Sequence, residues 1–126
     1  MNFPAAVPEI PAASVDNAVA YYVSRLGFTL DWGDEQGGIA GISRGNCRLF
    51  ITNSLFRESH GNAGPILFWV NLESKAAVDE LFAEWKAAAA KIVSEPEDKP
   101  WKLREFMAAD LDGNVIRVFY DFRLDG

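Results

Sequence analysis

Residues 7–28 read VPEIPAASVDNAVAYYVSRLGF and combine a short extended segment with a single helix. Pro8 and Pro11 each lack a backbone N–H, so we expect the extended part at a sheet edge or exchanged with a second subunit. Ser14 is a typical N-cap residue, and the apolar residues after it repeat at helical spacing. Gly27 is expected to end the helix in a left-handed conformation. This segment therefore predicts a strand followed directly by a helix.

The same order of elements continues along the chain and then occurs again. In the first half, further strands are predicted at residues 28–32, 38–43 and 47–52, and a polar, mobile loop at 53–64. In the second half we expect a strand at 65–72, a helix capped by Ser74, a short strand at 92–94 and a hairpin of strands at 102–108 and 114–120. The repeated order β-α-β-β-β predicts an α+β fold of two tandem βαβββ modules. We expect one domain over residues 1–126, with modules at about 5–53 and 64–122.

Composition restricts the possible partners. The 126 residues include 12 basic and 18 acidic side chains, for a net charge of −6. Nucleic acid is disfavoured as a partner because phosphate binding needs a basic face. A cationic small molecule is favoured by the same field, although acidity can also serve solubility alone. Nothing is apolar enough to span a membrane or to act as a signal peptide, and a single cysteine fits a reducing cytoplasm.

Tryptophan is the most unusual component, with four residues in so short a chain. Trp32 in DWGDE and Trp101 in EPEDKPWKLRE lie among charged residues and prolines, where a core position is disfavoured. Exposure or contact with a ligand is the alternative that we favour for both. Trp85 lies on the apolar stripe of the second helix, which predicts packing in the core.

Two segments carry a resemblance to a known family: AVAYYVSRLGF at 18–28 and DLDGNVIRVF at 110–119. They look like the most recurrent segments of the vicinal-oxygen-chelate superfamily, which includes glyoxalase I, extradiol dioxygenases and bleomycin-resistance proteins. Three shorter stretches resemble the bleomycin-resistance branch: AVP at 6–8, ELFAEWKA at 80–87 and KPWKLREF at 99–106. The resemblance implies that the two modules form an open cup and that two chains pair as a homodimer. Pro8 would then lie in an arm that crosses to the partner.

Enzymes of this superfamily hold a divalent metal with His and Glu side chains from four inner strands. The resemblance carries these positions onto Val7, Phe50, Pro65 and Arg117, and a shift of one or two residues in the first strand gives Pro8 or Glu9. Hydrocarbon side chains donate no lone pair, and a guanidinium repels a metal ion. The resemblance therefore predicts a binding protein with no metal, no cofactor and no catalysis. Of the remaining donors, His60 is expected in a solvated loop and Cys47 as a buried small hydrophobe.

A candidate ligand site follows from the same comparison. Trp32 and Trp101 match the positions whose rings, one from each chain, sandwich the planar bithiazole of bleomycin in clefts between two subunits. Strand alternation places on the inner face Glu9, Phe50, Leu67, Trp69, Arg117 and Phe119, although Phe50 and Phe119 fit a plain core equally well. Asp31 and Asp34, together with Glu35, are candidates to attract a cationic drug tail.

The resulting hypothesis is a cytoplasmic antibiotic-resistance protein that sequesters a bleomycin-type glycopeptide. The alternatives are a metal-dependent lyase or dioxygenase of the same superfamily, or a binding protein for another planar metabolite. Two departures from the best-known drug binders lie at the cleft rim. Gly37 stands where a bulky residue is expected, and PWKLREF is one residue longer than their PWGREF.

Overall fold

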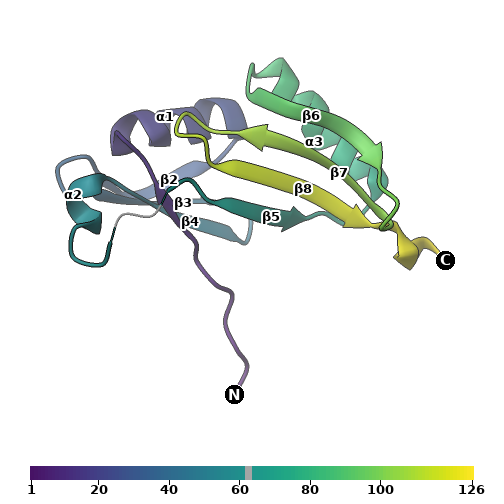
Figure 1. The fold of residues 1–126 in the computed structure, drawn as a ribbon, viewed down its shortest axis with the longest axis horizontal. Coiled ribbons are helices and arrows are strands. Elements are labelled where there is room, and N and C mark those ends of the chain that lie inside the picture. The colour runs from purple at the N-terminus through teal and green to yellow at the C-terminus, as the bar shows by residue number, and fades with distance from the viewer. Residues whose placement is uncertain (62–63) are drawn as a thin grey trace. The chain divides into compact units, whose positions relative to one another are not determined.

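The computed structural model describes residues 1–61 and 64–126 as two compact units, residues 1–65 and 66–126, which are treated separately below. Each unit contains one four-stranded sheet with a helix across one of its faces (Figure 1). The expected first module, about residues 5–53, lies inside the first unit, whereas the expected second module, about 64–122, begins two residues before the second unit. Residues 62–63 of the predicted loop lie outside the described residues.

The first unit consists of six elements, of which the first five come in the expected order. They are β1 (Glu9–Pro11), α1 (Val15–Leu26), β2 (Thr29–Asp34), β3 (Ile39–Arg44), β4 (Cys47–Thr52) and the four-residue helix α2 (Ser54–Arg57). The strand order is β1-β4-β3-β2, with β1 parallel to β4 and the other pairs antiparallel. The proline-containing strand β1 therefore lies at a sheet edge, where a missing N–H is tolerated.

The second unit repeats this topology. It consists of β5 (Leu67–Asn71), α3 (Lys75–Ala87), β6 (Lys91–Asp98), β7 (Leu103–Ala109), β8 (Val115–Asp121) and the short 3-10 helix η1 (Phe122–Asp125). The strand order β5-β8-β7-β6, with β5 parallel to β8, is the same as in the first unit. The prediction of two βαβββ modules is confirmed.

Both long helices begin and end where their sequences predict. The side-chain oxygens of Ser14 and Ser74 accept hydrogen bonds from the backbone N–H groups of Asn17 and Ala77, at 3.1 and 3.0 Å. These bonds satisfy N–H groups that have no partner within the helix. Gly27 has a φ of 77° and ends α1 in the left-handed conformation.

Two elements differ from the sequence prediction. Strand β6 is eight residues long and includes the charged run EPED, whereas only residues 92–94 were expected to be extended. It is an edge strand, and such strands tolerate charges and a proline such as Pro96 because one side of the backbone faces no partner strand. Helix α2 forms within the segment expected to be a loop, because the Asn53 side chain caps the N–H of Phe56 at 3.0 Å.

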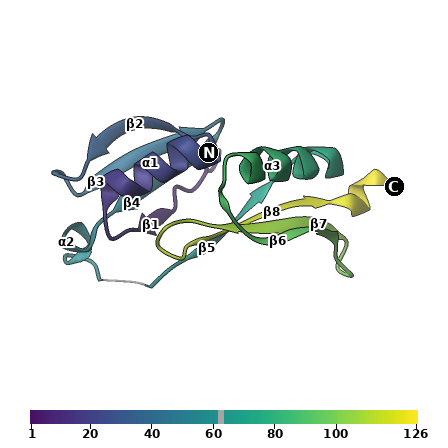
Figure 2. The same cartoon turned by 90° about the horizontal axis from the view of Figure 1, so that it is seen from above.

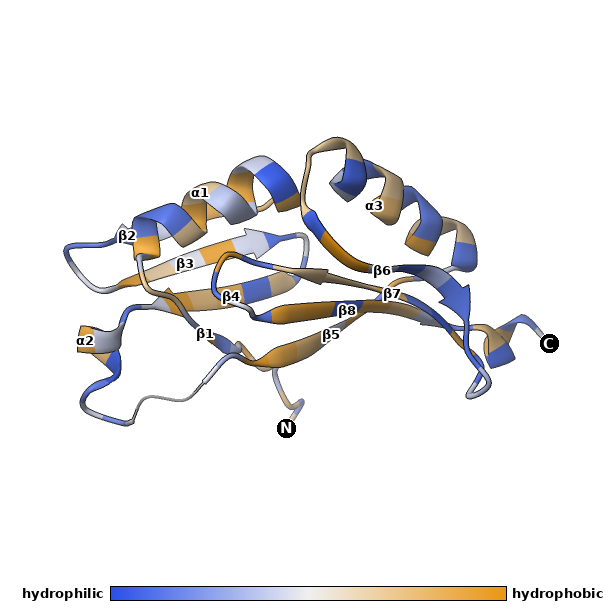
Figure 3. Ribbon diagram, turned by 45° about the horizontal axis from the view of Figure 1, so that its top comes forward, coloured by the Kyte–Doolittle hydropathy of each residue, from blue (hydrophilic) through white to orange (hydrophobic). Residues whose placement is uncertain are grey.

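Each sheet buries the face that its helix covers (Figure 2). Both helices alternate apolar and polar residues along their length, as their amphipathic sequences require (Figure 3). The core residues of the first unit include Ile10, Val15, Tyr22, Leu26, Ile42, Leu49 and Ile51. Those of the second unit include Val78, Trp85, Phe106, Ala108, Ile116 and Val118. Trp85 is 2% exposed and packs edge-to-face on Phe106, so its predicted core position is confirmed.

No helix of the described residues is long and apolar enough to cross a membrane. Cys47 is only partly buried, at the start of β4, so the expectation of a buried small hydrophobe was too strong. The burial that it does have raises the pKa of its thiol, because a thiolate is poorly stabilised away from water.

Candidate ligand-binding faces

The face of each sheet that turns away from its helix carries the candidate residues. In the first unit, Glu9 pairs with Phe50 and Trp32 pairs with Gly41, which in turn pairs with Phe50. Paired residues of neighbouring strands project to the same side of a sheet. We call this group, Glu9, Trp32, Gly41 and Phe50, the unit 1 face.

Trp32 lies against the backbone of β3 at Gly41. A Cβ atom added to Gly41 would come within 2.4 Å of the indole Nε1, so only glycine leaves room for the ring in this position. The indole contacts Phe50 edge-to-face, with 5.2 Å between the ring centroids. It nevertheless remains 43% exposed, as its polar sequence surroundings predicted. The unit 1 face therefore presents a partly solvated aromatic pair.

Glu9 has two partners in its own unit. Its Oε2 lies 2.9 Å from Nε2 of His60 and accepts a 3.0 Å hydrogen bond from the hydroxyl of Thr52. The hydrogen bond to His60, with a smaller contribution from Thr52, lowers the pKa of Glu9 against the opposing effect of burial. His60 was expected in a solvated loop, and its side chain is indeed 45% exposed. The contact with Glu9, 51 positions away, was not foreseen.

The acidic residues after Trp32 have different roles. Asp34 accepts a hydrogen bond from the N–H of Gly37 at 3.1 Å and thereby stabilises the turn between β2 and β3. Glu35 accepts hydrogen bonds from the Asn53 amide and the Ser14 hydroxyl, at 2.9 and 3.0 Å. The Asn53 bond is the main cause that lowers the pKa of Glu35. Asp31 lies exposed at the irregularity in β2, where it is accessible to a cation.

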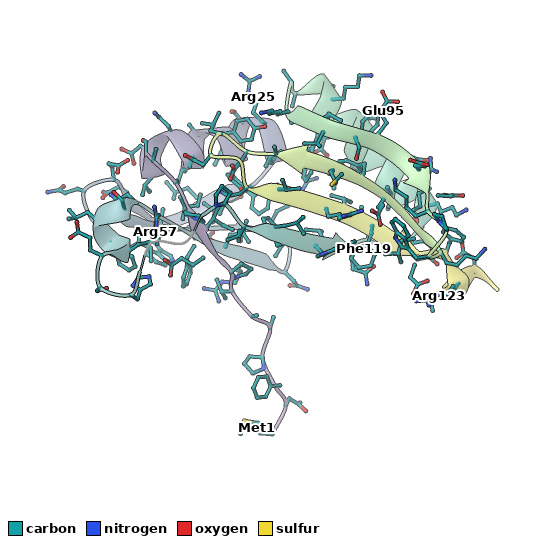
Figure 4. The ribbon with its side chains drawn as sticks, viewed as in Figure 1. Met1, Arg25, Arg57, Glu95, Phe119 and Arg123 are labelled. Atoms are coloured by element: carbon teal, nitrogen blue, oxygen red, sulfur yellow. The ribbon has the colours of Figure 1, made fainter. Side chains whose placement is uncertain are left out.

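In the second unit, the corresponding face is built on β5, β7 and β8. Trp69 pairs with Arg117, and Glu105 pairs with Phe119. The rings of Trp69 and Phe119 meet edge-to-face at 5.4 Å, and the Arg117 guanidinium lies 4.6 Å from the Trp69 centroid. Such a cation–π contact covers one side of the guanidinium with the ring. Figure 4 labels Phe119 on β8. We define the unit 2 face as the group Leu67, Trp69, Trp101, Glu105, Arg117 and Phe119.

Glu105 is the central polar residue of the unit 2 face and was not among the predicted site residues. It is 1% exposed, and its Oε1 accepts a 2.6 Å hydrogen bond from Nε of Arg117 and a second bond from Nη2. Its Oε2 accepts a 3.1 Å hydrogen bond from the indole N–H of Trp101. In the sequence, Glu105 lies on a predicted strand, at an alternating position whose side chain projects to the same face of the sheet as Arg117 on the neighbouring strand.

Trp101 lies in the turn before β7. The N–H of Lys102 donates to the carbonyl of Lys99 at 2.9 Å, and Lys102 adopts a positive φ of 71°. The indole is bonded to Glu105 through its N–H edge and is 52% exposed. Trp69 and Leu67 are also about half exposed, at 46% and 48%. The unit 2 face thus combines fixed orientation with exposed apolar area.

Strand register shows where the four positions carried over from the superfamily's metal ligands lie. Val7 precedes β1 and Pro65 precedes β5, so neither lies in a strand. The residue opposite Phe50 is Glu9, and the residue opposite Arg117 is Trp69. Of the opposed residues Glu9, Phe50, Trp69 and Arg117, only Glu9 has an atom that binds metal ions. The residues that the structure describes contain no group of three His, Cys, Asp or Glu side chains placed to hold a metal ion. The residues present do not fit the superfamily's metal.

Pro8, the predicted dimer-arm residue, lies beside the first sheet of its own chain. Its carbonyl accepts a hydrogen bond from the N–H of Phe50 at 3.0 Å. Residues 1–6 before it are exposed, and Met1 lies well away from the sheet of this unit (Figure 4). Exchange of this segment between subunits stays a prediction.

The family model described as the Glyoxalase/Bleomycin resistance protein/Dioxygenase superfamily matches residues 6–118. The chain therefore belongs to this superfamily. A comparison with curated proteins found no match.

The solved structures with the same fold include a protein named as a lyase and proteins whose names state no single activity. A glyoxalase/bleomycin resistance protein/dioxygenase from Nocardioides is 22% identical, with a TM-score of 0.77, and the match covers 95% of this chain and 85% of that chain. TioX from Micromonospora sp. ML1 is 26% identical, with a TM-score of 0.72 and coverage of 94% and 99%. Lactoylglutathione lyase from Agrobacterium tumefaciens is 21% identical, with a TM-score of 0.76 and coverage of 92% of each chain. These similarities establish the fold and leave the activity to the site.

Proposed function

We propose that this protein binds a cationic glycopeptide antibiotic of the bleomycin type through its planar aromatic part and keeps it from its target without catalysis. The observation that carries the proposal is the half-exposed aromatic surface on the helix-free face of each unit. Trp32 and Phe50 supply it in the first unit, and Trp69, Trp101 and Phe119 supply it in the second. By the resemblance, these are the faces on which related enzymes carry metal ligands.

Aromatic rings on an exposed face suit a flat ligand. Leaving three tryptophans between 43% and 52% exposed costs hydrophobic free energy that a stacked ligand would recover. Each offset-stacked pair adds about 1 kcal/mol beyond the area that it buries. The bond from Trp101 to Glu105 reduces the rotamer freedom that binding would otherwise remove.

Charge favours a cationic ligand over an anionic one. The chain has a net charge of −6, and Arg117 of the unit 2 face is already paired with Glu105. Long-range attraction of this kind increases the association rate and decreases with salt. Asp31, which is exposed and adjacent to Trp32 in β2, is the acidic residue proposed to contact a cationic tail there.

The absence of catalysis is proposed on the chemistry of the donor set. The strand-paired positions of the unit 1 face offer the Glu9 carboxylate and the Phe50 ring, and those of the unit 2 face offer the Trp69 ring and the Arg117 guanidinium. The carboxylate of Glu9 already has two hydrogen-bond partners. In such enzymes a bound divalent metal polarises a substrate oxygen, and the metal itself needs several His or carboxylate ligands. We therefore expect purified protein to bind ligand without converting it.

Titration with bleomycin, with and without bound copper, tests the proposal. We expect quenching of tryptophan fluorescence, recovery of intact drug after incubation, and at least about tenfold weaker binding by Trp101→Ala, the loss expected for a stacking anchor. Leu111→Ala is the matched control, because Leu111 is a 59% exposed apolar residue in the turn between β7 and β8. Absence of any response at saturating drug would overturn the drug assignment, and chemical change of the drug would overturn the non-catalytic role.

A further inference from the structure

We infer that Glu105 determines the charge preference of the unit 2 face, by neutralising Arg117 while it orients Trp101, so that the face accepts planar cations and rejects planar anions. This inference rests on the proposed function, since it concerns the ligand class of the same surface. It assigns a role to a residue that touches no ligand itself.

The geometry of the carboxylate supports two separate roles. Oε1 receives both Arg117 hydrogen bonds, and Oε2 receives the indole N–H of Trp101. One buried group therefore fixes a cation and an aromatic ring that are 16 positions apart in sequence (117 − 101). A carboxylate is the side chain that can accept on both oxygens while carrying the compensating charge.

The surroundings of Arg117 explain why its positive charge is not available to bind an anionic ligand. One side of the guanidinium lies 4.6 Å from the centroid of Trp69, and its Nε and Nη2 donors point to Glu105. The side chain is 22% exposed, so an incoming group would meet the Arg117–Glu105 pair as a neutral unit. Aromatic faces carry negative potential, and Trp69 and Trp101 already have Arg117 and Lys99 near their rings, at 4.6 and 5.9 Å from the ring centroids. The exposed remainder of each ring therefore suits a planar cation.

Replacement of Glu105 by glutamine separates the two roles. Glutamine keeps a carbonyl oxygen for the Trp101 N–H but removes the charge that compensates Arg117. The uncompensated guanidinium then becomes a binding group for carboxylate or sulfonate ligands. Glu105→Gln is therefore expected to change which charge is preferred, and not only how tightly any ligand is held.

Two probes that share one ring system measure this preference: pyrenemethylammonium and pyreneacetate. For the wild type we expect tighter binding of the cation. In Glu105→Gln, the ratio of the Kd for pyreneacetate to the Kd for pyrenemethylammonium should fall at least about tenfold, as expected for one charge at contact range. Glu95→Gln is the charge-matched control, because Glu95 is exposed on β6 and lies well apart from Phe119 (Figure 4). Its ratio should change by less than about threefold, because salt screens a distant charge.

A second variant keeps the inference testable if Glu105→Gln does not fold. Arg117→Gln leaves the carboxylate without its cation, so the preference for pyrenemethylammonium should increase. An unchanged ratio in either folded variant overturns the role of Glu105, while cation binding by the wild type leaves the proposed function standing. Failure of the wild type and Glu95→Gln to bind pyrene probes and bleomycin alike overturns the proposed function itself.

Discussion

Gly41 and Trp32 form a complementary pair in which a missing side chain makes room for a large one. Glycine in a strand interior is unfavourable by itself, and it occurs where another group approaches the backbone closely. The indole Nε1 would lie 2.4 Å from a Cβ at this position. The orientation of Trp32 on the unit 1 face therefore depends on a residue that presents no side chain to a ligand.

We expect Gly41→Ala to displace the Trp32 indole from β3. Overpacking of this kind costs roughly 1–3 kcal/mol, and the displaced ring should show a changed emission maximum and weaker quenching by ligand. Urea unfolding and fluorescence of the variant measure both effects. Gly64→Ala is the control, since a Cβ there meets nothing within 4 Å. Identical emission spectra for Gly41→Ala and the wild type would contradict the packing described.

A second residue-scale prediction concerns Glu9 and pH. Its pKa is lower in the folded protein than in an unfolded chain, because His60 and Thr52 donate hydrogen bonds to the ionised form. A depressed carboxyl pKa contributes stability above the unfolded value of about 4.3, and this contribution is lost as the pH falls through the folded pKa. Because the pair is about half exposed, we expect less than about 1 kcal/mol.

Urea unfolding of the wild type and Glu9→Gln between about pH 7 and about pH 3 measures this contribution. The wild type should be the more stable at neutral pH, and the difference should vanish at the acid end. His60→Ala should lack most of the pH-dependent stability that Glu9 contributes in the wild type, because the hydrogen bond from His60 is the main cause of the lowered pKa. Two curves that stay parallel over the whole range would argue against a depressed pKa.

At the scale of elements, the start of α1 is connected to more of its unit than the start of α3. Ser14 caps α1 and also donates a hydrogen bond from its hydroxyl to Glu35 at 3.0 Å. Glu35 in turn accepts the Asn53 amide, and Asn53 caps α2. The caps of α1 and α2 are therefore joined through one carboxylate, whereas Ser74 acts as the cap of α3.

We expect Ser14→Ala to destabilise the protein more than Ser74→Ala does. Loss of an N-cap costs about 1 kcal/mol, and loss of the hydrogen bond to the Glu35 carboxylate adds to this destabilisation. Chemical unfolding of both variants at neutral pH gives the comparison. Glu35→Gln should remove part of the extra loss in Ser14→Ala but none in Ser74→Ala. Equal destabilisation by the two serine variants would show that the link through Glu35 contributes nothing.

At the scale of the whole molecule, we propose that two chains associate, as the resemblance to the bleomycin-resistance branch implies. The resemblance places Pro8 in an arm that reaches a partner, and the exposed segment at residues 1–6 is available for such a contact. We expect the mass in solution, measured by light scattering, to be twice the chain mass of 13.9 kDa. Removal of residues 1–6 should weaken the association. A wild-type protein that remains monomeric at high concentration would contradict the dimer and the expected sharing of a drug cleft.

Local sequence patterns determined the elements of this protein and their order. The caps Ser14 and Ser74, the stop at Gly27 and the helical stripe containing Trp85 act within a few residues, so their effects are visible without a fold. The exposure of Trp32 and Trp101 was also foreseen from their polar neighbours. The full length of the charged edge strand β6 and the short helix α2 were not predicted, because tertiary pairing and a side-chain cap outweigh their weak local preference.

The tertiary structure alone decided which distant residues meet. Contacts between Glu9 and His60, between Gly41 and Trp32, and between Glu105, Trp101 and Arg117 depend on strand register and on where a loop returns to its sheet. A register shift of one residue reverses every side chain in a strand, and sequence periodicity leaves the partner strand's alignment open. The identity of the aromatic residues was therefore readable from the sequence. The buried carboxylate that orients Trp101 and Arg117 required the fold.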